Sequence, residues 1–538
     1  MAAASDIDFP GFIQKNLSFG LRSAFSRSLL NPPVSSLPAA SSGGGRTLYR
    51  LVHEETFYGG ESLVATTTDI ELARLELHKS VHAKYLDVVK KHRFAPILKH
   101  LSLSAVWDDE AWFGQKQVSS FRIATKHANI NSKAFSVDIN ALKSYAGEIL
   151  GDMSETKVSV ARLLDEFWWR RQARKRLREI REALWLHLYP LKLKAGVSID
   201  AHRASRAQDQ ATDIWAGKRV IYHKESGLKF AIDTSAESRK KRYSELLCRT
   251  SGISKRAAEA GLTAFFITAT APSNMHATTT KNGKRVENEN WDGTLPADAH
   301  SFLLKAWANT RSSATFRRIK REIGHIDFVR ATEPHGDGTP HIHVLVFLRL
   351  NDKEALENVL RRCFKCRKCD GEARFKHGIK VEMKKDAGHI VSYLAKYIAK
   401  SAGSDVEKPD ADVLAWRRAH GGIRSFALSR SGATVWKRAR AKHLDHTQDE
   451  DLKLVIDAAK QNDAFEFDKL SVGFSLFYEE AENGYGETVS RVAGVYNRRT
   501  SEITFFHSKC VIATKAEAAL IDCVHIVKSD RSRGVSQE

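Results

Sequence analysis

Two histidines one residue apart, His341 and His343, follow a tight turn and precede an apolar run in the stretch EPHGDGTPHIHVLVF. Successive side chains of a strand point to opposite faces, so both imidazoles share one face while the residues between and after them point into a core. Neighbouring imidazoles form a metal-binding pair. We expect the third ligand from the adjacent strand, where Glu333 can lie opposite the histidines; His335, within the turn, is a competing candidate. The pattern alone also fits two surface histidines on a hairpin.

Two tyrosines, Tyr393 and Tyr397, are spaced at i and i+4 in the stretch SYLAKYIAK. On a helix this spacing places them on one face, one above the other. A phenol has a pKa near ~10 and becomes a nucleophile only when something lowers that value or takes its proton. Lys396 and Lys400 each follow a tyrosine by three residues and can stabilise a phenolate or a phosphate. The alternative is that the tyrosines pack on a sheet and the lysines face water.

Together, the histidine pair, the acidic partner and the tyrosine pair supply the parts for metal-assisted transesterification of a phosphodiester. A bound metal ion would act as Lewis acid and template for the scissile phosphate. A tyrosine would attack in line, form a 5′-phosphotyrosine and release a 3′-OH. Because one ester replaces another, the reaction can reverse and rejoin the strand, and a second tyrosine can perform a second transfer.

The elements that must position these residues are three strands and two helices. Aromatic and β-branched residues predict strands at residues 262–272, 325–334 and 341–350, the last two joined as a hairpin by the turn residues Gly336, Asp337, Gly338 and Pro340. A helix capped by Asn351 or Asp352 is expected at residues 351–363. The tyrosine pair is expected on a helix at residues 387–403 that ends at a glycine.

The charge balance points to a polyanionic partner. The chain has 538 residues and a formal net charge of +21, which favours binding to nucleic acid. Its six cysteines are too few for a disulfide framework and fit a reducing, cytoplasmic setting. The N-terminal stretch lacks the features of a signal peptide, and no apolar run approaches the length of a membrane span, so we expect no membrane association.

Composition divides the chain into four regions. Residues 1–46 form an N-terminal arm and a linker rich in Pro, Ser and Gly, and residues 47–195 form a mostly helical, basic region. In that region a long helical pattern begins near Lys157 and ends at Pro190. Residues 196–440 hold the candidate chemistry, and residues 441–538 form a small β-rich module whose role the sequence does not indicate.

Four stretches, taken in order, resemble a known family. FFITATAPSNMHA (residues 265–277) resembles its first strand motif, TEPHGDGTPHIHVLVF (332–347) its metal motif, SYLAKYIAK (392–400) its two-tyrosine motif and AWRRAHGGIRSFALSRSGATVWKRAR (415–440) the segment that follows. The chain thus resembles the HUH endonucleases and, among them, the phage replication gene A protein family of rolling-circle initiators. The resemblance covers roughly residues 150–440, and the order and spacing of the motifs carry it.

The resemblance implies an α+β fold with an HUH-type central antiparallel sheet of about five strands and flanking helices. It implies His341, His343 and Glu333 as metal ligands, Mg²⁺ or Mn²⁺ as the ion, and Tyr393 and Tyr397 as nucleophiles. The implied substrate is single-stranded or melted DNA at a phage origin, nicked in the cytoplasm of a bacterial host. A host helicase and polymerase would then extend the freed 3′-OH.

One feature departs from the family pattern. The stretch CFKCRKC contains Cys363, Cys366 and Cys369 between the metal motif and the tyrosine motif. With His377 as fourth ligand, these thiolates could form a structural zinc site. The other interpretation is three cytosolic thiols in a basic loop.

Two other functions remain as alternatives. A two-tyrosine HUH transposase shares the catalytic parts but moves an element instead of replicating a genome. A non-catalytic basic DNA-binding protein would use the histidines for a structural metal and the tyrosines as core. A conjugative relaxase fits less well, because its tyrosine precedes the histidine motif and both tyrosines follow it here.

Overall fold

The computed structural model describes residues 49–53, 62–67, 90–91, parts of 140–147, 159–365, 378–384, 411–507 and 510–517, with breaks at 164, 224–226, 422, 430–431, 442 and 516. Every structural statement below concerns these residues. None of their helices has the length and apolar character needed to cross a bilayer.

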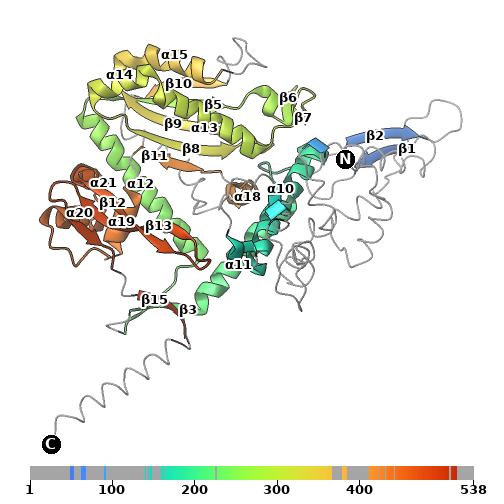
Figure 1. Cartoon of the computed structure of the whole chain (residues 1–538). Coiled ribbons are helices and arrows are strands. Elements are labelled where there is room, and N and C mark those ends of the chain that lie inside the picture. The colour runs from blue at the N-terminus through green and yellow to red at the C-terminus, as the bar shows by residue number, and fades with distance from the viewer. Residues whose placement is uncertain are drawn as a thin grey trace, which may run out of the picture.

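A five-stranded antiparallel sheet forms the centre of the described structure (Figure 1). Its strand order is β10-β5-β9-β8-β11. The bounds are β5 Thr263–Thr270, β8 Phe328–Pro334, β9 Pro340–Leu348, β10 Ile379–Lys384 and β11 Phe426–Leu428. The α+β class and the five-stranded antiparallel sheet agree with the prediction, and the ends of β5, β8 and β9 match those of the predicted strands to within three residues. The two edge strands, β10 and β11, were not predicted.

Three helices cover one face of this sheet, called here the helix-covered face. They are α13 (Pro296–Ser312), α14 (Ala314–Ile323) and α15 (Lys353–Cys363), which follows the short 3-10 helix η4 (Leu350–Asp352). Residues of all three helices belong to one core cluster with residues of the strands. Alternate residues of β5 and β9 supply the sheet's part of this core, as the two-residue period of a strand requires. These residues are Phe265, Ile267, Ala269, Ile342, Val344, Val346 and Leu348.

The other face, called here the open face, is covered in part by α12 (Ser235–Glu259). A capping box begins this helix, since Thr234 and Glu237 bond reciprocally to each other's backbone N–H groups. Its apolar side packs on Val329, Leu345 and Phe347. The remaining end of this face carries the histidine pair.

The N-terminal helices lie beside one end of the sheet. The predicted helix between Lys157 and Pro190 occurs as two pieces, α9 (Val160–Leu163) and α10 (Glu166–Leu188), before the 3-10 helix η2 (Pro190–Lys192). α11 (Ile199–Gly217) begins at Ser198, whose side chain accepts from the Ala201 N–H. It packs against α18 (Ala411–Ala419). Farther upstream, β1 (Tyr49–His53) pairs with β2 (Ser62–Thr67).

The C-terminal unit combines helices with a sheet, whereas a β-rich module was expected. Three helices share one core: α19 (Ala433–Arg440), α20 (Glu450–Lys460) and α21 (Ala464–Leu470). The 3-10 helix η5 (Ser471–Gly473) then leads into a three-stranded sheet of β12 (Phe474–Glu482), β13 (Thr488–Asn497) and β14 (Ile503–Phe505). β15 (Cys510–Thr514) pairs with β3 (Arg219–His223), which pairs with β4 (Lys229–Ala231). Residues 510–514 therefore pair with the strand that directly follows α11. The predicted domain boundaries remain predictions.

The tip of the β12–β13 hairpin contacts the start of the N-terminal helices. Glu487 accepts from Arg162 Nη2 at 2.8 Å and from the Ser159 N–H at 3.2 Å. The Tyr485 hydroxyl donates to the carboxylate of Asp165. The start of the N-terminal helices and the β12–β13 hairpin therefore lie side by side, although they are more than 300 residues apart in the sequence.

Arg256 on α12 joins the central sheet to the C-terminal unit. Its Nε lies 2.9 Å from Oδ2 of Asp327, just before β8, and its Nη1 lies 2.8 Å from Oδ2 of Asp468 in α21. Burial would raise the pKa of Asp327, but hydrogen bonds from His325 and Arg256, the charge of Arg256 and the Ser429 hydroxyl outweigh it and hold that pKa well below its usual value. The ionised carboxylate is thus the form that the fold stabilises.

We expect Asp327→Asn to lower the free energy of unfolding by about 3 kcal/mol, because it leaves a buried guanidinium partly uncompensated. Since the folded-state pKa is depressed, this stabilisation is complete above the unfolded-state pKa of about 3.9 and is lost as the pH falls through the folded-state value. Urea unfolding at pH 7 and below pH 4 measures the difference. Glu450→Gln, which removes the exposed partner of Lys453, is the control and should change little. Equal effects of the two substitutions would contradict the role of Asp327.

Candidate metal centre

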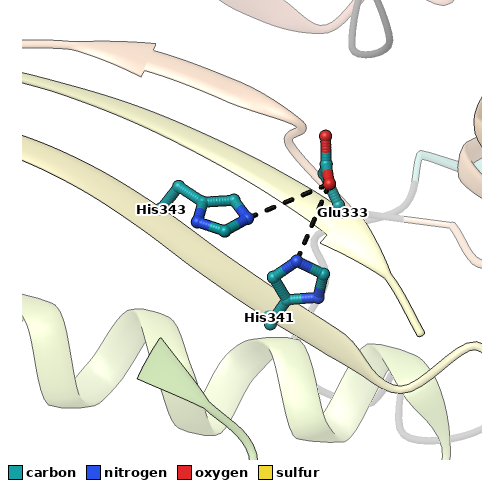
Figure 2. Close-up of side chains that lie close together, drawn as sticks. All are labelled: Glu333, His341 and His343. Carbon is teal, nitrogen blue, oxygen red and sulfur yellow. Dashed lines mark ion pairs between the residues drawn. The ribbon is translucent and has the colours of Figure 1, made fainter. Parts of the chain in front are cut away.

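The histidine pair and Glu333 come together on the open face of the sheet. The register of β8 and β9 places Glu333 opposite His341 and Ala331 opposite His343. Oε2 of Glu333 lies 3.7 Å from Nε2 of His341 and 3.9 Å from Nε2 of His343. One potential ligand atom from each of the three residues lies within 4.8 Å of the others, and Figure 2 shows the carboxylate directed toward both rings.

Neighbouring side chains orient the two imidazoles. Thr268 on β5 lies opposite His343 in the register, and its hydroxyl is 3.2 Å from Nδ1 of that ring. This contact leaves Nε2 directed at Glu333, as an outer partner of a metal-binding histidine does. Phe266 stacks on the same ring at 5.5 Å between centroids. His335, the competing third ligand, packs its ring 4.4 Å from that of His341.

The donor set fits a divalent cation. It offers two imidazole nitrogens and one carboxylate oxygen, a mixed set that divalent transition ions such as Mn²⁺ accept, whereas Mg²⁺ depends more on the oxygen ligand and on water. The Glu333 and His343 side chains are 8% and 7% exposed, so an ion held here would be partly screened from bulk solvent. The His341 side chain is half-buried and more exposed than the other two.

A buried carboxylate organises the turn between Glu333 and His341. Asp337 Oδ1 accepts from the Thr339 N–H at 3.0 Å, and its Oδ2 accepts from the Thr278 N–H at 3.3 Å and lies 3.2 Å from Nδ1 of His276. Burial alone would raise the pKa of Asp337, but the hydrogen bond and charge of His276 and the two backbone N–H groups lower it overall. The turn is thereby tied to the segment around β6 (Thr278–Lys281), which pairs with β7 (Lys284–Glu287).

Two glycines let the same turn approach the chain before α11. Gly196 donates its N–H to the Gly336 carbonyl at 3.0 Å, and Gly338 has a φ of +84°. A Cβ on Gly338 would lie 2.9 Å from the Cα and the carbonyl oxygen of Gly196. Trp416 on α18 donates to the Gly338 carbonyl at 2.9 Å. Contacts from Gly196 and Trp416, which are distant in sequence, therefore fix the turn of the hairpin that carries the candidate ligands.

The hairpin lies in a region that is similar to a known protein family. A family model described as "Bacteriophage replication gene A protein (GPA)" matches residues 108–405, which is more than half of the chain. The chain belongs to this family. The resemblance seen in the sequence motifs is thereby confirmed, and the matched region contains the three candidate ligands as well as both tyrosines.

Three relatives show the extent of the similarity. The replication gene A protein of Escherichia phage 186 is 32% identical over 270 residues, which cover 46% of this chain and 36% of the relative. The replication protein of Haemophilus phage HP1 (strain HP1c1) is 31% identical over 287 residues, covering 48% and 35%. A probable replication endonuclease from a prophage-like region of Shigella boydii serotype 4 (strain Sb227) is 29% identical over 255 residues, covering 45% and 30%. The matches thus span about a third of the relatives' length, and no solved structure matches the chain.

Other predicted site residues fall outside the described part of this gene A family chain. Tyr393, Tyr397 and Lys396 lie in the segment 385–410, and Cys366, Cys369 and His377 lie in 366–377. Cys363 ends α15 as a half-buried free thiol. The nucleophile and zinc assignments therefore remain predictions.

Several supporting residues were not recognised from the sequence. Thr268, His276 and Trp416 are brought to the hairpin by strand register and by helix packing, neither of which a local pattern reveals. Asp337 and Gly338 were assigned to a turn, but their buried contacts were not expected. The signal available was the GDG sequence, in which an aspartate between glycines commonly bonds the backbone two residues later.

We expect His341→Ala and Glu333→Gln each to weaken Mn²⁺ binding by more than about tenfold, because each removes a ligand atom from the group. Mn²⁺ titration followed by electron paramagnetic resonance measures the free ion. His507→Ala, an exposed histidine that stacks on His446, is the control and should bind Mn²⁺ as the wild type does. Wild-type affinity in both ligand variants would contradict the site.

Gly338→Ala should weaken Mn²⁺ binding, because the added methyl group must displace Gly196 and with it the turn that spaces Glu333 from His341. Gly324→Ala is a matched control: its φ is +78°, and a Cβ there would meet no atom within 4 Å. Both variants should lose about 1–2 kcal/mol of stability from the left-handed backbone. The Mn²⁺ affinity should fall for Gly338→Ala alone, and an equal loss in both would refute the link to the turn.

Proposed function

We propose that this chain is a site-specific DNA endonuclease and strand-joining enzyme that initiates rolling-circle replication at a phage origin. The observation that carries the proposal is the group formed by Glu333, His341 and His343 on one face of an antiparallel sheet. Support comes from the family and from relatives that are named replication proteins or probable replication endonucleases. These relatives are longer than the matched region, so their activity is carried over here as part of the proposal.

Glu333, His341 and His343 would hold Mn²⁺ or Mg²⁺, which when bound supplies Lewis-acid stabilisation of charge on a phosphoryl oxygen. The side chains themselves orient this site before DNA arrives. Thr268 holds the His343 ring, and the Asp337 turn sets the separation between Glu333 and His341. Such preorganisation lowers the entropic cost of placing a phosphate at the site.

Tyr393 and Tyr397 are the proposed nucleophiles. The phenol oxygen of one attacks the phosphorus, loses its proton and forms the phosphotyrosine bond as the bond to the 3′-oxygen breaks, and that oxygen takes up a proton to become the 3′-OH. Lys396 would stabilise the phenolate or the phosphate. The chain leaves the sheet at β10 and re-enters the described structure at α18, which contacts the hairpin turn through Trp416; the tyrosine segment 385–410 joins these two elements.

DNA is the proposed substrate, as single-stranded or melted origin sequence. The formal charge of +21 favours association with a polyanion and predicts strong salt dependence of binding. A host helicase and polymerase are the proposed partners that would use the 3′-OH as a primer.

Incubation of the full chain with single-stranded and supercoiled phage DNA and Mn²⁺ should give a protein–DNA conjugate on a denaturing gel. Tyr393→Phe/Tyr397→Phe should bind DNA within about twofold of wild type and form no conjugate, because a phenyl ring lacks the attacking oxygen. His341→Ala should lose the conjugate together with Mn²⁺ binding.

The single variants Tyr393→Phe and Tyr397→Phe serve as controls, since one remaining tyrosine can still form a first conjugate in at least one of them. Unchanged conjugate in the double variant would show that neither tyrosine is the nucleophile. A wild-type chain that binds DNA but never cleaves it would instead favour the non-catalytic DNA-binding protein.

A further inference from the structure

A buried arginine lies on the helix-covered face of the sheet, behind the candidate metal centre. Arg330 belongs to β8 and faces the opposite side from Glu333, since the two are three positions apart along the strand. Its side chain shares this face with Phe328 and Thr332 and is 6% exposed as a residue. One Nη2 hydrogen bond reaches the Arg424 carbonyl at 3.4 Å, and Nε has no hydrogen-bond partner among the described residues.

Among the residues that the structure describes, no carboxylate forms an ion pair with Arg330. Among the described residues, the charged groups that act on it are Arg311 and Arg424, and together with burial, which acts most strongly, they lower its pKa to about 10. His300 on α13 also has no partner for Nε2, and burial together with the charge of Arg330 lowers its pKa to about 4, so it is neutral near pH 7. A buried guanidinium without a carboxylate is costly unless an anion pairs with it.

The rim of this site is accessible and positively charged. Arg311 lies in the last turn of α13, with its guanidinium 5.3 Å from the Phe328 ring centre, and Arg424 precedes β11. Both arginines are exposed. In the register of the edge strand, the residue opposite Arg330 is Ala427, whose side chain is small and partly exposed. The small side chain of Ala427 therefore adds little bulk beside the guanidinium at this edge of the sheet.

We infer that Arg330, with Arg311 and Arg424 at its rim, binds a backbone phosphate of single-stranded DNA at the β8–β11 edge, on the face opposite the candidate metal centre. This inference rests on the proposed function, because it takes DNA to be the polyanion. A DNA strand that contacts both the Arg330 site and the candidate metal centre must therefore pass around the edge of the sheet. One phosphate is held by a rigid strand residue three positions from Glu333, so a fixed length of DNA would separate the anchored phosphate from the metal centre.

The test measures binding of a labelled, mixed-sequence single-stranded oligonucleotide to the full chain in EDTA, where no cleavage occurs, over a range of salt concentrations. Arg330→Met should weaken binding about tenfold and make the slope of log K against log salt shallower by about 0.7, the value for one lost contact to a single strand. Arg311→Gln and Arg424→Gln should act in the same direction and, being exposed, leave the fold intact. Arg318→Gln is the matched control, because that arginine is already paired with Glu322 at 2.8 Å.

Loss of affinity and a shallower slope in the Arg330 and rim variants, with Arg318→Gln unchanged, support the inference. Unchanged binding by Arg311→Gln and Arg424→Gln overturns the inference. If Arg330→Met unfolds, the rim variants still decide, and their unchanged binding would mean that Arg330 has a structural role. Conjugate formation with Mn²⁺ is measured separately at saturating DNA and should persist in the rim variants. A wild-type chain without conjugate would count against the proposed nuclease activity but leave the salt-slope result standing.

Discussion

The candidate site depends on the buried carboxylate of Asp337. It accepts hydrogen bonds from the backbone N–H groups of Thr278 and Thr339 and lies beside His276, so it joins the β8–β9 turn to a separate segment of the chain. Glu333 and His341 stand at the two ends of this turn, and their spacing follows from its shape. A short loop would otherwise be among the more mobile parts of a domain. Here several hydrogen bonds from distant elements make it a rigid support for a ligand group.

The strand β8 presents different chemistry to each side of the sheet. Glu333 points to the open face and Arg330 to the helix-covered face, as alternation along a strand requires. The acidic side chain belongs to the candidate cation site, and the basic one is placed to bind an anion. A single strand of a sheet can in this way contact both a metal ion and the polyanion on which the ion acts.

The sequence was sufficient to predict the parts of the site that obey local periodicity. Alternation along residues 341–350 placed His341 and His343 on one face, and the hairpin turn placed Glu333 opposite them; the structure brings all three together. The edge strands β10 and β11 escaped prediction because they are short and pair with strands distant in sequence. The contact between Gly196 and Gly338 depends on helix packing, which no local pattern contains. The C-terminal unit was expected to be β-rich, whereas its helices α20 and α21 share a core with α19 from the preceding region.

The contact of the β12–β13 hairpin tip with Arg162 and Asp165 bears on how far the chain can be shortened. These residues are distant in sequence and contact each other directly, and Arg256 joins α21 to Asp327, the residue before the strand that carries Glu333. A fragment that contains only residues 108–405, the region of the family match, would lack α19, α20 and α21. The side of α12 that packs on these helices would then be exposed. The region that the family model matches is therefore shorter than the set of elements that pack on one another in the described structure.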